Sequence, residues 1–502
     1  MPNVADSLWQ HAAERPDAVA LRTRDRQLTY RELARRCATF GGTLADAGVT
    51  AGDRVLLVAP TVPEFAVAYL GTQLIGAIAI TMNTMATVPE IGYVLDDSGA
   101  QVAIAWHDAQ VATRRAATER QLTFRSLAPG ESPETAKPVS APTPRHRADT
   151  AALLYTSGTT GQPKGVELTV GNLIDAARIF AEQFALGPGE RFGTGLPLFH
   201  IFGQAVCLLP SLHAGGSLSM LAPFAPRAMI DLIRYHRLTV VAGVPTMWNA
   251  MLHNNDGYGP EHFDSLRLAA SGGAALPSDV LHAFSRRFGC TILEGYGLTE
   301  TTAVGTFNSA REQRTGSVGT VLPGVSLEIR DLDGHALPAD TVGEIFLHGP
   351  NIMKGYWHRP DATTDTLADG WLKTGDLGRT DADGYLYIVD RAKDLIIRGG
   401  YNVYPAEVEN VLYQHPDIIE VAVIGVPDDH YGEEVAAVVA TTPGVYLEPT
   451  QLRAWAKQRL SAYKVPHRFA FVDHLPKGAT GKILKRALDW DSLNHASGHE
   501  VR

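Results

Sequence analysis

The chain has 502 residues, of which 45% are hydrophobic and 20% are charged, and its formal net charge is −10. This length exceeds one ordinary hydrophobic core, so we expect two or more domains of a soluble globular protein. The negative charge excludes a broad basic surface for nucleic acid, and an anionic substrate would need local lysines and arginines. Cys37, Cys207 and Cys290 lie far apart without zinc spacing, which predicts buried thiols.

The N-terminus has no basic segment followed by an apolar core, so no signal peptide is expected. The most apolar window, residues 65–82, is interrupted by Gly71, Thr72, Gln73 and Gly76. These interruptions favour a buried helix that leads into a strand over a membrane span. Together with the unpaired cysteines, they predict a cytoplasmic protein with no membrane span.

Helical and strand-like patterns alternate to about residue 320 and predict layers of an α/β fold. Thr29 and Glu32 have the spacing of a capping box, which predicts a helix start, and residues 129–144 predict a connecting loop. From residue 316 to 389, short strands with Asp-x-Asp-Gly turns dominate, and a smaller α+β unit follows. The predicted domains are therefore residues 1–389 and 390–502.

A polar loop from Thr156 to Lys164 follows an apolar run over residues 151–154 that predicts a buried strand. The loop holds four hydroxyl residues, two glycines and a lysine in nine positions. Glycines bring backbone N–H groups close to a ligand, while hydroxyls and the lysine complement a polyphosphate. It is not a Walker A loop, because Gly165 follows Lys164. A simple polar surface turn is the alternative interpretation.

The loop is the first of a series of short motifs that recur in order along the chain. The others include residues 196–200, 243–246, 271–274, 294–300, 371–376, 390–394, 398–409 and 476–483. In this order and spacing, the chain resembles the acyl-adenylate-forming superfamily, and within it the fatty acyl-CoA synthetases. The resemblance covers most of the chain. It implies a large N-terminal domain of two layered α/β subdomains plus a distorted β-barrel, with a small mobile α+β C-terminal domain.

The resemblance implies an ATP-dependent ligase that joins a carboxylate to the α-phosphate of ATP, releases pyrophosphate and then transfers the acyl group to coenzyme A. Such chemistry depends on positioning and charge neutralisation, so a Ser-His-Asp set is not required. ATP, Mg²⁺ and coenzyme A are the implied cofactors and substrates. A homodimer is common among the proteins it resembles, and the sequence leaves the oligomeric state open.

The resemblance also implies roles for individual residues. Catalysis falls to Lys482, Glu300, Thr156 and Lys164, with Glu300 and Thr156 as magnesium ligands. The implied nucleotide-binding residues are Thr156, Ser157, Gly158, Thr159, Thr160, Lys164, Gly272, Gly273, Ala274, Glu294, Gly295, Tyr296, Gly297, Leu298, Thr299, Asp376, Ile388, Arg391 and Lys482. Among these, Asp376 would hold the ribose hydroxyls, and Lys482 would stabilise charge in the adenylation transition state. Asp390 matches the hinge, and the implied coenzyme A contacts are Lys393, Arg398, Gly399, Gly400 and Tyr401.

The acid pocket is the least determined part of the resemblance. Its implied residues are His200, Ile201, Phe202, Gln204, Val244, Pro245 and Gly297. The set is apolar, and Gly295 stands where malonate-activating relatives carry an arginine, so a dicarboxylate would leave a buried charge unpaired. No aspartate near Val206 or Val244 offers a partner for an amino-acid amine. A medium- or long-chain fatty acid fits best, and an aryl acid stays open.

Two other functions remain as alternatives. The acyl group could be loaded onto the phosphopantetheine of a carrier protein, but the chain has no appended carrier domain and no extra loop of the kind that hinders coenzyme A. A non-catalytic protein that binds acyl nucleotides is the other alternative. The retained Lys164, Glu300, Asp376, Arg391 and Lys482 argue against it.

Overall fold

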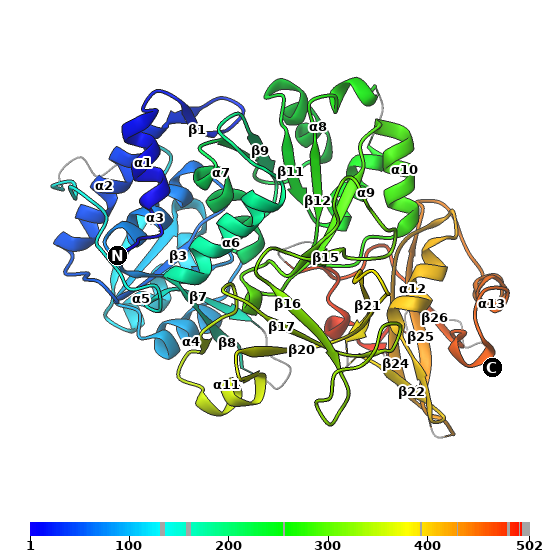
Figure 1. Ribbon diagram of the computed structural model, residues 1–502. Helices are drawn as coiled ribbons and strands as arrows, with labels where there is room; N and C mark the ends of the chain where they lie inside the picture. The colour runs from blue at the N-terminus through cyan, green and yellow to red at the C-terminus, as the bar shows by residue number, and fades with distance from the viewer. Residues whose placement is uncertain are drawn as a thin grey trace.

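The computed structural model describes residues 1–130, 136–156, 162–254, 257–391, 394–428, 430–478, 482–490 and 492–493. A large N-terminal domain of three β-sheets stands beside a small C-terminal domain with a sheet of its own (Figure 1). The α/β layering predicted from the sequence is therefore confirmed. Within the described ranges, no helix combines the length and apolarity that crossing a bilayer requires.

A seven-stranded sheet lies in the N-terminal third of the chain, in the order β18-β8-β7-β4-β3-β5-β6. Its strands are β3 (Arg54–Val58), β4 (Ile78–Met82), β5 (Val102–Trp106), β6 (Thr123–Leu127), β7 (Thr150–Thr156), β8 (Lys164–Thr169) and β18 (Gly355–Tyr356). Strands β3 to β7 pair in parallel, and β8 and β18 add an antiparallel edge. The neighbouring helices are α2 (Tyr30–Asp46), α3 (Pro63–Leu74), α4 (Val88–Ser98) and α5 (Gln110–Glu119). The apolar window thus forms α3 followed by β4, as predicted.

A nine-stranded sheet has the order β15-β14-β13-β12-β11-β9-β10-β1-β2. Its strands are β1 (Val19–Arg22), β2 (Gln27–Thr29), β9 (Arg191–Thr194), β10 (Ser217–Met220), β11 (Val240–Gly243), β12 (Leu268–Ser271), β13 (Ile292–Tyr296), β14 (Thr306–Phe307) and β15 (Thr320–Val321). The accompanying helices are α1 (Asp6–Glu14), α6 (Val170–Gln183), the π-helix η2 (Gly203–Leu208), α7 (Leu209–His213), α8 (Pro226–Tyr235), α9 (Pro245–His253) and α10 (Ser278–Phe288). Strands β9, β11, β12 and β13 run parallel, so their carboxyl ends share one edge.

A five-stranded antiparallel sheet completes the N-terminal domain at the place of the predicted barrel, and its hydrogen-bonded order is open. It consists of β16 (Ser326–Arg330), β17 (Gly343–His348), β19 (Leu367–Ala368), β20 (Trp371–Thr380) and β21 (Leu386–Arg391), with α11 (Pro360–Thr366) between β18 and β19. The Asp-x-Asp-Gly turns form as predicted, since the N–H groups of Gly334 and Gly384 donate to the carbonyls of Asp331 and Asp381.

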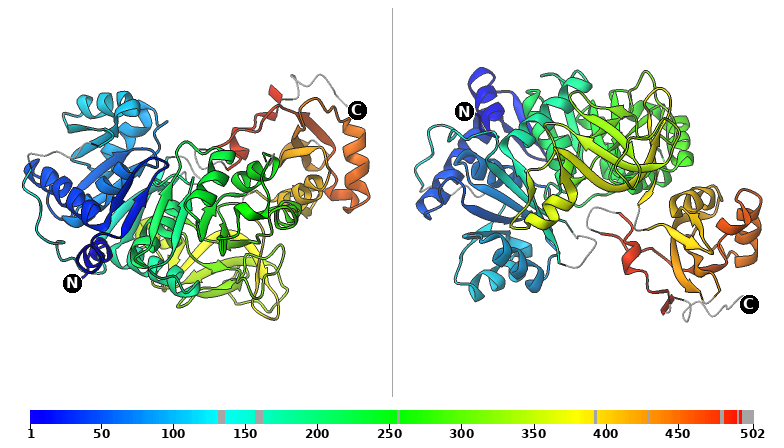
Figure 2. Two further views of the ribbon diagram at one scale, coloured as in Figure 1. Left: turned by 90° about the horizontal axis from the view of Figure 1, so that it is seen from above. Right: turned by 60° about the horizontal axis from the view of Figure 1, so that its bottom comes forward.

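The C-terminal domain has its own five-stranded sheet and core. Its elements are β22 (Ile396–Arg398), β23 (Tyr401–Val403), α12 (Pro405–Tyr413), β24 (Ile418–Asp428), β25 (Gly432–Thr441), α13 (Pro449–Lys457) and β26 (Arg468–Phe471). Both views of Figure 2 show the last segment of the chain, in red, between this domain and the large one. Strand pairing passes from the large domain to the small one between Arg391 and Ile396. The boundary at residues 389 and 390 stays a prediction.

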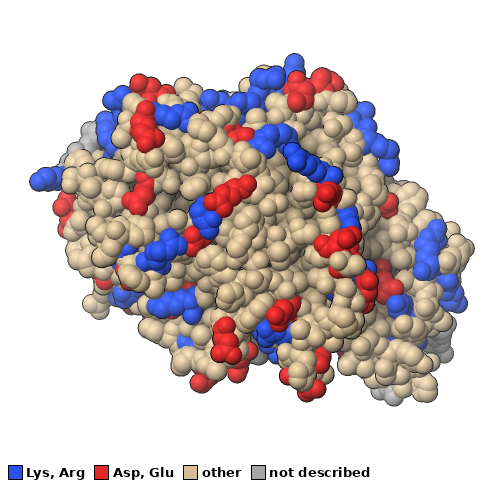
Figure 3. Space-filling model, viewed as in Figure 1, with Lys and Arg blue, Asp and Glu red and all other residues tan. Residues whose placement is uncertain are grey.

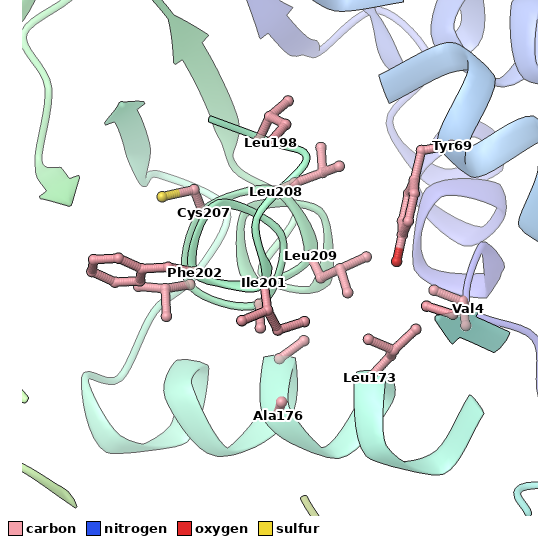
Figure 4. Packing of buried hydrophobic residues seen from close by; sticks show 14 of the residues in the cluster. Val4, Tyr69, Leu173, Ala176, Leu198, Ile201, Phe202, Cys207, Leu208 and Leu209 are labelled. Atoms are coloured by element: carbon pink, nitrogen blue, oxygen red, sulfur yellow. The ribbon is translucent and has the colours of Figure 1, made fainter. Parts of the chain in front are cut away.

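The largest hydrophobic core joins the helices and sheets of the N-terminal domain. Figure 4 shows Ile201 directed toward Leu173 and Ala176 of α6. Thr29 and Glu32 form the predicted capping box at the start of α2. Cys37, Cys207 and Cys290 are buried free thiols, as predicted. On the face shown in Figure 3, basic and acidic side chains are interspersed.

Candidate active site

The candidate site lies at the carboxyl edge of the nine-stranded sheet. Residues 196–200 follow β9, Val244 and Pro245 follow β11, residues 272–274 follow β12, and Gly297 follows β13. Ligands of open parallel sheets bind beyond the carboxyl ends of the strands. Parallel pairing therefore collects sequence motifs about 100 residues apart into one place. Leu298 and Thr299 continue from β13 into the short helix η4 (Thr299–Thr301), which carries Glu300.

Asp376 forms the centre of a polar cluster between β13, β20 and β21. The hydroxyl of Tyr296 donates to its Oδ2 at 2.6 Å, and Arg391 Nε lies 3.3 Å from its Oδ1. Asp376 and Arg391 are also paired in the β20–β21 register, with Ile388 three residues before Arg391. Burial and the adjacent carboxylate raise the pKa of Tyr296 well above its usual range. The cluster therefore holds a carboxylate and a guanidinium in fixed positions, where they can bind sugar hydroxyls.

A second polar cluster forms around Tyr356. Its hydroxyl donates to Glu300 Oε1 at 2.9 Å, and Lys164 Nζ lies 5.2 Å from the centre of its ring. Thr156 pairs with Lys164 across β7 and β8, so its hydroxyl belongs to the same edge. The predicted loop residues Ser157, Gly158, Thr159 and Thr160 lie outside the described residues. The sequence does not predict this contact of Tyr356 with Glu300, because 56 residues separate them.

Glu300 has the properties of a ligand for a divalent cation. Burial raises the pKa of its carboxyl group, and the hydroxyl of Tyr356 donates to one of its two oxygens. A hard cation such as Mg²⁺ takes carboxylate oxygens and would offset the cost of burying this charge. The residues present therefore fit Mg²⁺, with Glu300 as ligand and Thr156 at the same edge as the second predicted ligand.

Lys482 brings a positive charge from the C-terminal domain to this place. The residue is exposed, but nearby protein atoms partly desolvate its amine. This partial desolvation, together with the charge of Arg391, lowers the pKa of Lys482 to about 8. Desolvation and the charge of Lys482 lower the pKa of His200 to about 4. Lys482 therefore lies close enough to Arg391, Asp376 and His200 for its charge to act on them, and we call the place where these four residues meet the cleft.

His200 is a neutral hydrogen-bond donor in this cleft. Its Nδ1 accepts the backbone N–H of Phe202 at 3.2 Å, so the ring proton belongs on Nε2. With its low pKa, the ring stays uncharged at neutral pH. It can donate a hydrogen bond to an oxygen but cannot supply a second positive charge.

The apolar wall of the site consists of aromatic rings against glycine backbones. A Cβ at Gly272 would lie 3.3 Å from Phe202 Cζ, and one at Gly273 would lie 3.6 Å from Val244 Cγ1. The ring of Phe307 fills the space that a side chain at position 295 would need. Phe307 packs in turn on Phe180 and Phe184. Pro245 is buried at the start of α9, whereas Gly273 and Ala274 are exposed.

Three predicted site residues, Ile201, Gln204 and Glu294, have buried side chains. Ile201 faces the core toward α6, because the helical segment that begins at Ile201 and continues into η2 packs on α6 (Figure 4). Gln204 is fully buried in η2, where its Nε2 donates to Leu198 O and Thr81 Oγ1 and so fixes the turn before His200. Glu294 is buried beneath the loop after β12 and accepts the N–H of Leu276. Gln204 and Glu294 therefore stabilise the backbone around the site, and Ile201 contributes to the core next to it.

The predicted coenzyme A contacts lie in and after β22, and one of them has a partner within the C-terminal domain. Arg398 is only 8% exposed, and its guanidinium makes two bonds of 2.6 and 2.8 Å to Glu434, so it stabilises the C-terminal domain. Gly399 and Gly400 follow with φ values of 56° and 85°, which favour glycine. Tyr401 is exposed and stacks on Tyr463. Lys393 lies outside the described residues.

The hinge candidate Asp390 lies in β21 and bonds forward into the C-terminal domain. Its Oδ2 accepts the N–H of Ala406 in the first turn of α12 at 2.9 Å. Its Oδ1 accepts the N–H of Arg391. Asp390 thus connects the last strand of the large domain to the first helix of the small one.

Comparison with protein families decides the class of this chain. The model for the AMP-binding enzyme matches residues 8–357, and that for the AMP-binding enzyme C-terminal domain matches residues 407–482. The chain belongs to the AMP-binding enzyme family. Both matched regions contribute to the cleft, the first through His200 and Glu300 and the second through Lys482.

Its relatives are ligases with different acids. A feruloyl-CoA synthase from Amycolatopsis is 39% identical over 94% of this chain and 95% of its own length. A long-chain-fatty-acid–CoA ligase from Bacillus subtilis is 33% identical over 97% of this chain and 94% of its own. ATP-bound MatB from Rhodopseudomonas palustris superposes with a TM-score of 0.91 at 33% identity, covering 99% of both chains. This member of the family is thus an AMP-binding enzyme of the acyl-CoA ligase type.

Proposed function

We propose that this protein activates an apolar monocarboxylic acid with ATP, forms an acyl-adenylate with release of pyrophosphate, and transfers the acyl group to coenzyme A. The observation that carries the proposal is the shared cleft of Lys482, His200, Asp376 and Arg391, with Glu300 at its side. It combines groups for a nucleotide, a phosphate charge and a metal with an apolar wall. These are the groups that attack of a carboxylate on ATP requires.

In the first half-reaction, the residues act mainly by position and charge. Asp376 and Arg391 would hold the ribose, and Lys482 would neutralise charge that develops around the α-phosphate. Lys164 and Glu300 would face the leaving phosphates, where Glu300 holds Mg²⁺ when it is bound. The Nε2–H of His200 would donate to an oxygen near the acid carboxylate, because a neutral donor adds no competing charge.

The second half-reaction would use the other face of the C-terminal domain. We propose that rotation about Asp390 removes Lys482 and brings Gly399 and Gly400 toward the adenylate. Glycine backbones with positive φ permit close approach to the thin pantetheine arm. A carrier-protein phosphopantetheine has the same arm, so this geometry alone does not choose the acceptor, and we propose coenzyme A from the names of the relatives.

For the acid, we propose an aryl acid first and a medium- or long-chain fatty acid second. Aromatic rings against glycine backbones, such as Phe202 on Gly272, offer flat surfaces that suit a planar ring. Phe307 packs on Phe180 and Phe184 and fills the space beside Gly295, so it would limit the length of an acid that reached this place. The 39% identity to a feruloyl-CoA synthase supports this choice. The proposal of a fatty acid is supported by the absence of charge in the predicted pocket residues and by the similarity to a long-chain-fatty-acid–CoA ligase.

The test is pyrophosphate release with ATP and Mg²⁺ across benzoic, phenylpropenoic and straight-chain acids, with and without coenzyme A. We expect release with a phenylpropenoic acid that rises with coenzyme A, together with acyl-CoA detected by mass. Preference for straight-chain acids would select the second substrate class. Release that never yields acyl-CoA would exclude coenzyme A as the acceptor, and no release with any acid would overturn the proposed function.

A further inference from the structure

Residues 476–478 and 482–484, which we call the turn, lie antiparallel to each other. The N–H of Gly478 donates to Lys482 O at 2.8 Å, and the N–H of Leu484 donates to Pro476 O at 2.8 Å. In both views of Figure 2, the red part of the ribbon lies on the side of the C-terminal domain that faces the large domain. Two further lysines, Lys477 and Lys485, flank Lys482 on either side of the turn. Neither has a role in the proposed reaction.

Each flanking lysine is paired with a carboxylate of the C-terminal domain. Lys485 Nζ lies 2.6 Å from Glu409 Oε1 of α12, and that oxygen also accepts the N–H of Val423 at 2.7 Å. Lys477 pairs with Oε1 of Glu420 on β24. The two ion pairs therefore attach the chain on both sides of Lys482 to the C-terminal domain.

The two carboxylates are better fixed than those of ordinary surface ion pairs. Glu420 is 8% exposed, and its Oε2 accepts the N–H of Leu475 at 3.0 Å. The side chain of Glu409 is 17% exposed. Exposed ion pairs contribute little because both side chains stay mobile, but carboxylates that also accept backbone N–H bonds hold their partners in place.

The helix that carries Glu409 also receives the hinge. Asp390 accepts the N–H of Ala406 in the first turn of α12, three residues before Glu409. One end of one helix thus contacts both the hinge residue and the segment of Lys482. A rotation of α12 about the hinge would carry Lys482 with it as a rigid unit.

We propose that Glu409 and Glu420, acting through Lys485 and Lys477, are positioning residues that fix Lys482 for acyl-adenylate formation. The inference rests on the proposed function. A lysine amine at the end of a flexible stem needs a fixed backbone, and a misplacement of about 1 Å can cost about 100-fold in rate. Both ion pairs, which we call the brace, lie within the C-terminal domain, so they are retained when this domain rotates.

The experiment compares Glu409→Gln and Glu420→Gln with the matched control Glu407→Gln. Glu407 lies on the same helix and pairs with Lys464 at 2.7 Å, outside the turn. We expect Glu409→Gln and Glu420→Gln to lower kcat for acyl-adenylate formation by about 10- to 100-fold. Their conversion of supplied acyl-adenylate to acyl-CoA, and the activity of Glu407→Gln, should stay within about twofold of wild type. Lys485→Arg should retain most of the adenylation rate, because it keeps the pair.

A readout without turnover separates this inference from the proposed function. The amide of Leu484 donates to Pro476 O, so its hydrogen exchange reports how firmly the brace holds the turn. This exchange should be faster in Glu409→Gln but unchanged in Glu407→Gln. Equal loss of both half-reactions, or unchanged adenylation and exchange in both Gln variants, would overturn the positioning role. A wild-type protein that activates no acid, with exchange still faster in Glu409→Gln, would overturn the proposed function and leave the brace intact.

Discussion

The N-terminal and C-terminal domains contribute to the cleft in different ways. In the N-terminal domain, Asp376 is bonded to Tyr296 and Arg391, and Glu300 is bonded to Tyr356, before any ligand arrives. The C-terminal domain contributes Lys482 from a segment that two ion pairs attach to that domain. The difference indicates a division of labour. Residues that are already held in place in the N-terminal domain would bind the nucleotide, and the charge of Lys482 on the mobile C-terminal domain would act in one half-reaction.

Lys482→Ala separates the two contributions most strongly. Removing one preorganised charge from a transition state typically costs about 100- to 1000-fold, so we expect that loss in acyl-adenylate formation. Thioester formation from supplied acyl-adenylate should stay near the wild-type rate, because Lys482 would be outside the cleft in that step. The two half-reactions are measured by pyrophosphate release and by acyl-CoA production.

The control for this variant is Lys464→Ala, which removes another C-terminal lysine that pairs with Glu407 outside the cleft. It should leave both half-reactions unchanged. An equal loss of both half-reactions in Lys482→Ala would contradict the division of labour.

Asp376→Asn tests the nucleotide-binding role of the N-terminal domain. The change weakens charged bonds to Tyr296 and Arg391 and to a ribose, each worth about 1.5–3 kcal/mol, so KM for ATP should rise about 10- to 100-fold. KM for the acid should change much less. Asp340→Asn, which removes an exposed partner of Arg379 on the same strand, is the control. A rise in KM for the acid equal to that for ATP would show that Asp376 does not serve the nucleotide specifically.

The pH dependence of acyl-adenylate formation should report the protonation of the Lys482 amine. The pKa of Lys482 is lowered to about 8, so the amine is charged below that pH and loses its proton as the pH rises through it. We therefore expect kcat/KM for ATP to fall above about pH 8. In Lys482→Arg, which stays charged, this fall should disappear even if the overall rate is lower. An unchanged profile in the arginine variant would assign the fall to another group.

Phe307→Leu should give the smallest effect, a change of acid preference. A smaller side chain beside Gly295 would enlarge the apolar space, and pockets discriminate by about 1–3 kcal/mol per methylene. We expect kcat/KM for bulkier acids to rise about 3- to 10-fold relative to benzoic acid. Phe284→Leu in the separate core cluster of α8, α9 and α10 is the matched control for lost packing. The same shift of preference in both variants would remove Phe307 from the pocket wall.

Sequence motifs identified candidate polar groups, because chemistry restricts the residue types that such a site can use. The structure brings Asp376, Arg391 and Lys482 together with Glu300 nearby, and their roles stay predictions. The α/β layering and the α3–β4 passage also followed from periodicity and turn residues.

Side-chain direction and long-range pairing could not be predicted in the same way. Ile201 belongs to the pocket motif, but it begins a helical segment that directs its side chain into the core toward α6 (Figure 4). Arg398 stands beside two glycines of the proposed coenzyme A path, but Glu434, 36 residues later, binds its guanidinium. The pairing of Glu409 with Lys485 depends in the same way on how α12 packs, which no local pattern reveals.

Detection of the acyl-adenylate by mass, followed by its conversion after coenzyme A is added, tests the central claim most directly. The wild-type protein would be incubated with ATP, Mg²⁺ and a phenylpropenoic acid before coenzyme A is supplied. We expect acyl-adenylate to accumulate first and acyl-CoA to replace it after the addition. An adenylate that persists after coenzyme A is added would contradict the second half-reaction, and absence of the adenylate with every aryl and straight-chain acid would contradict the account as a whole.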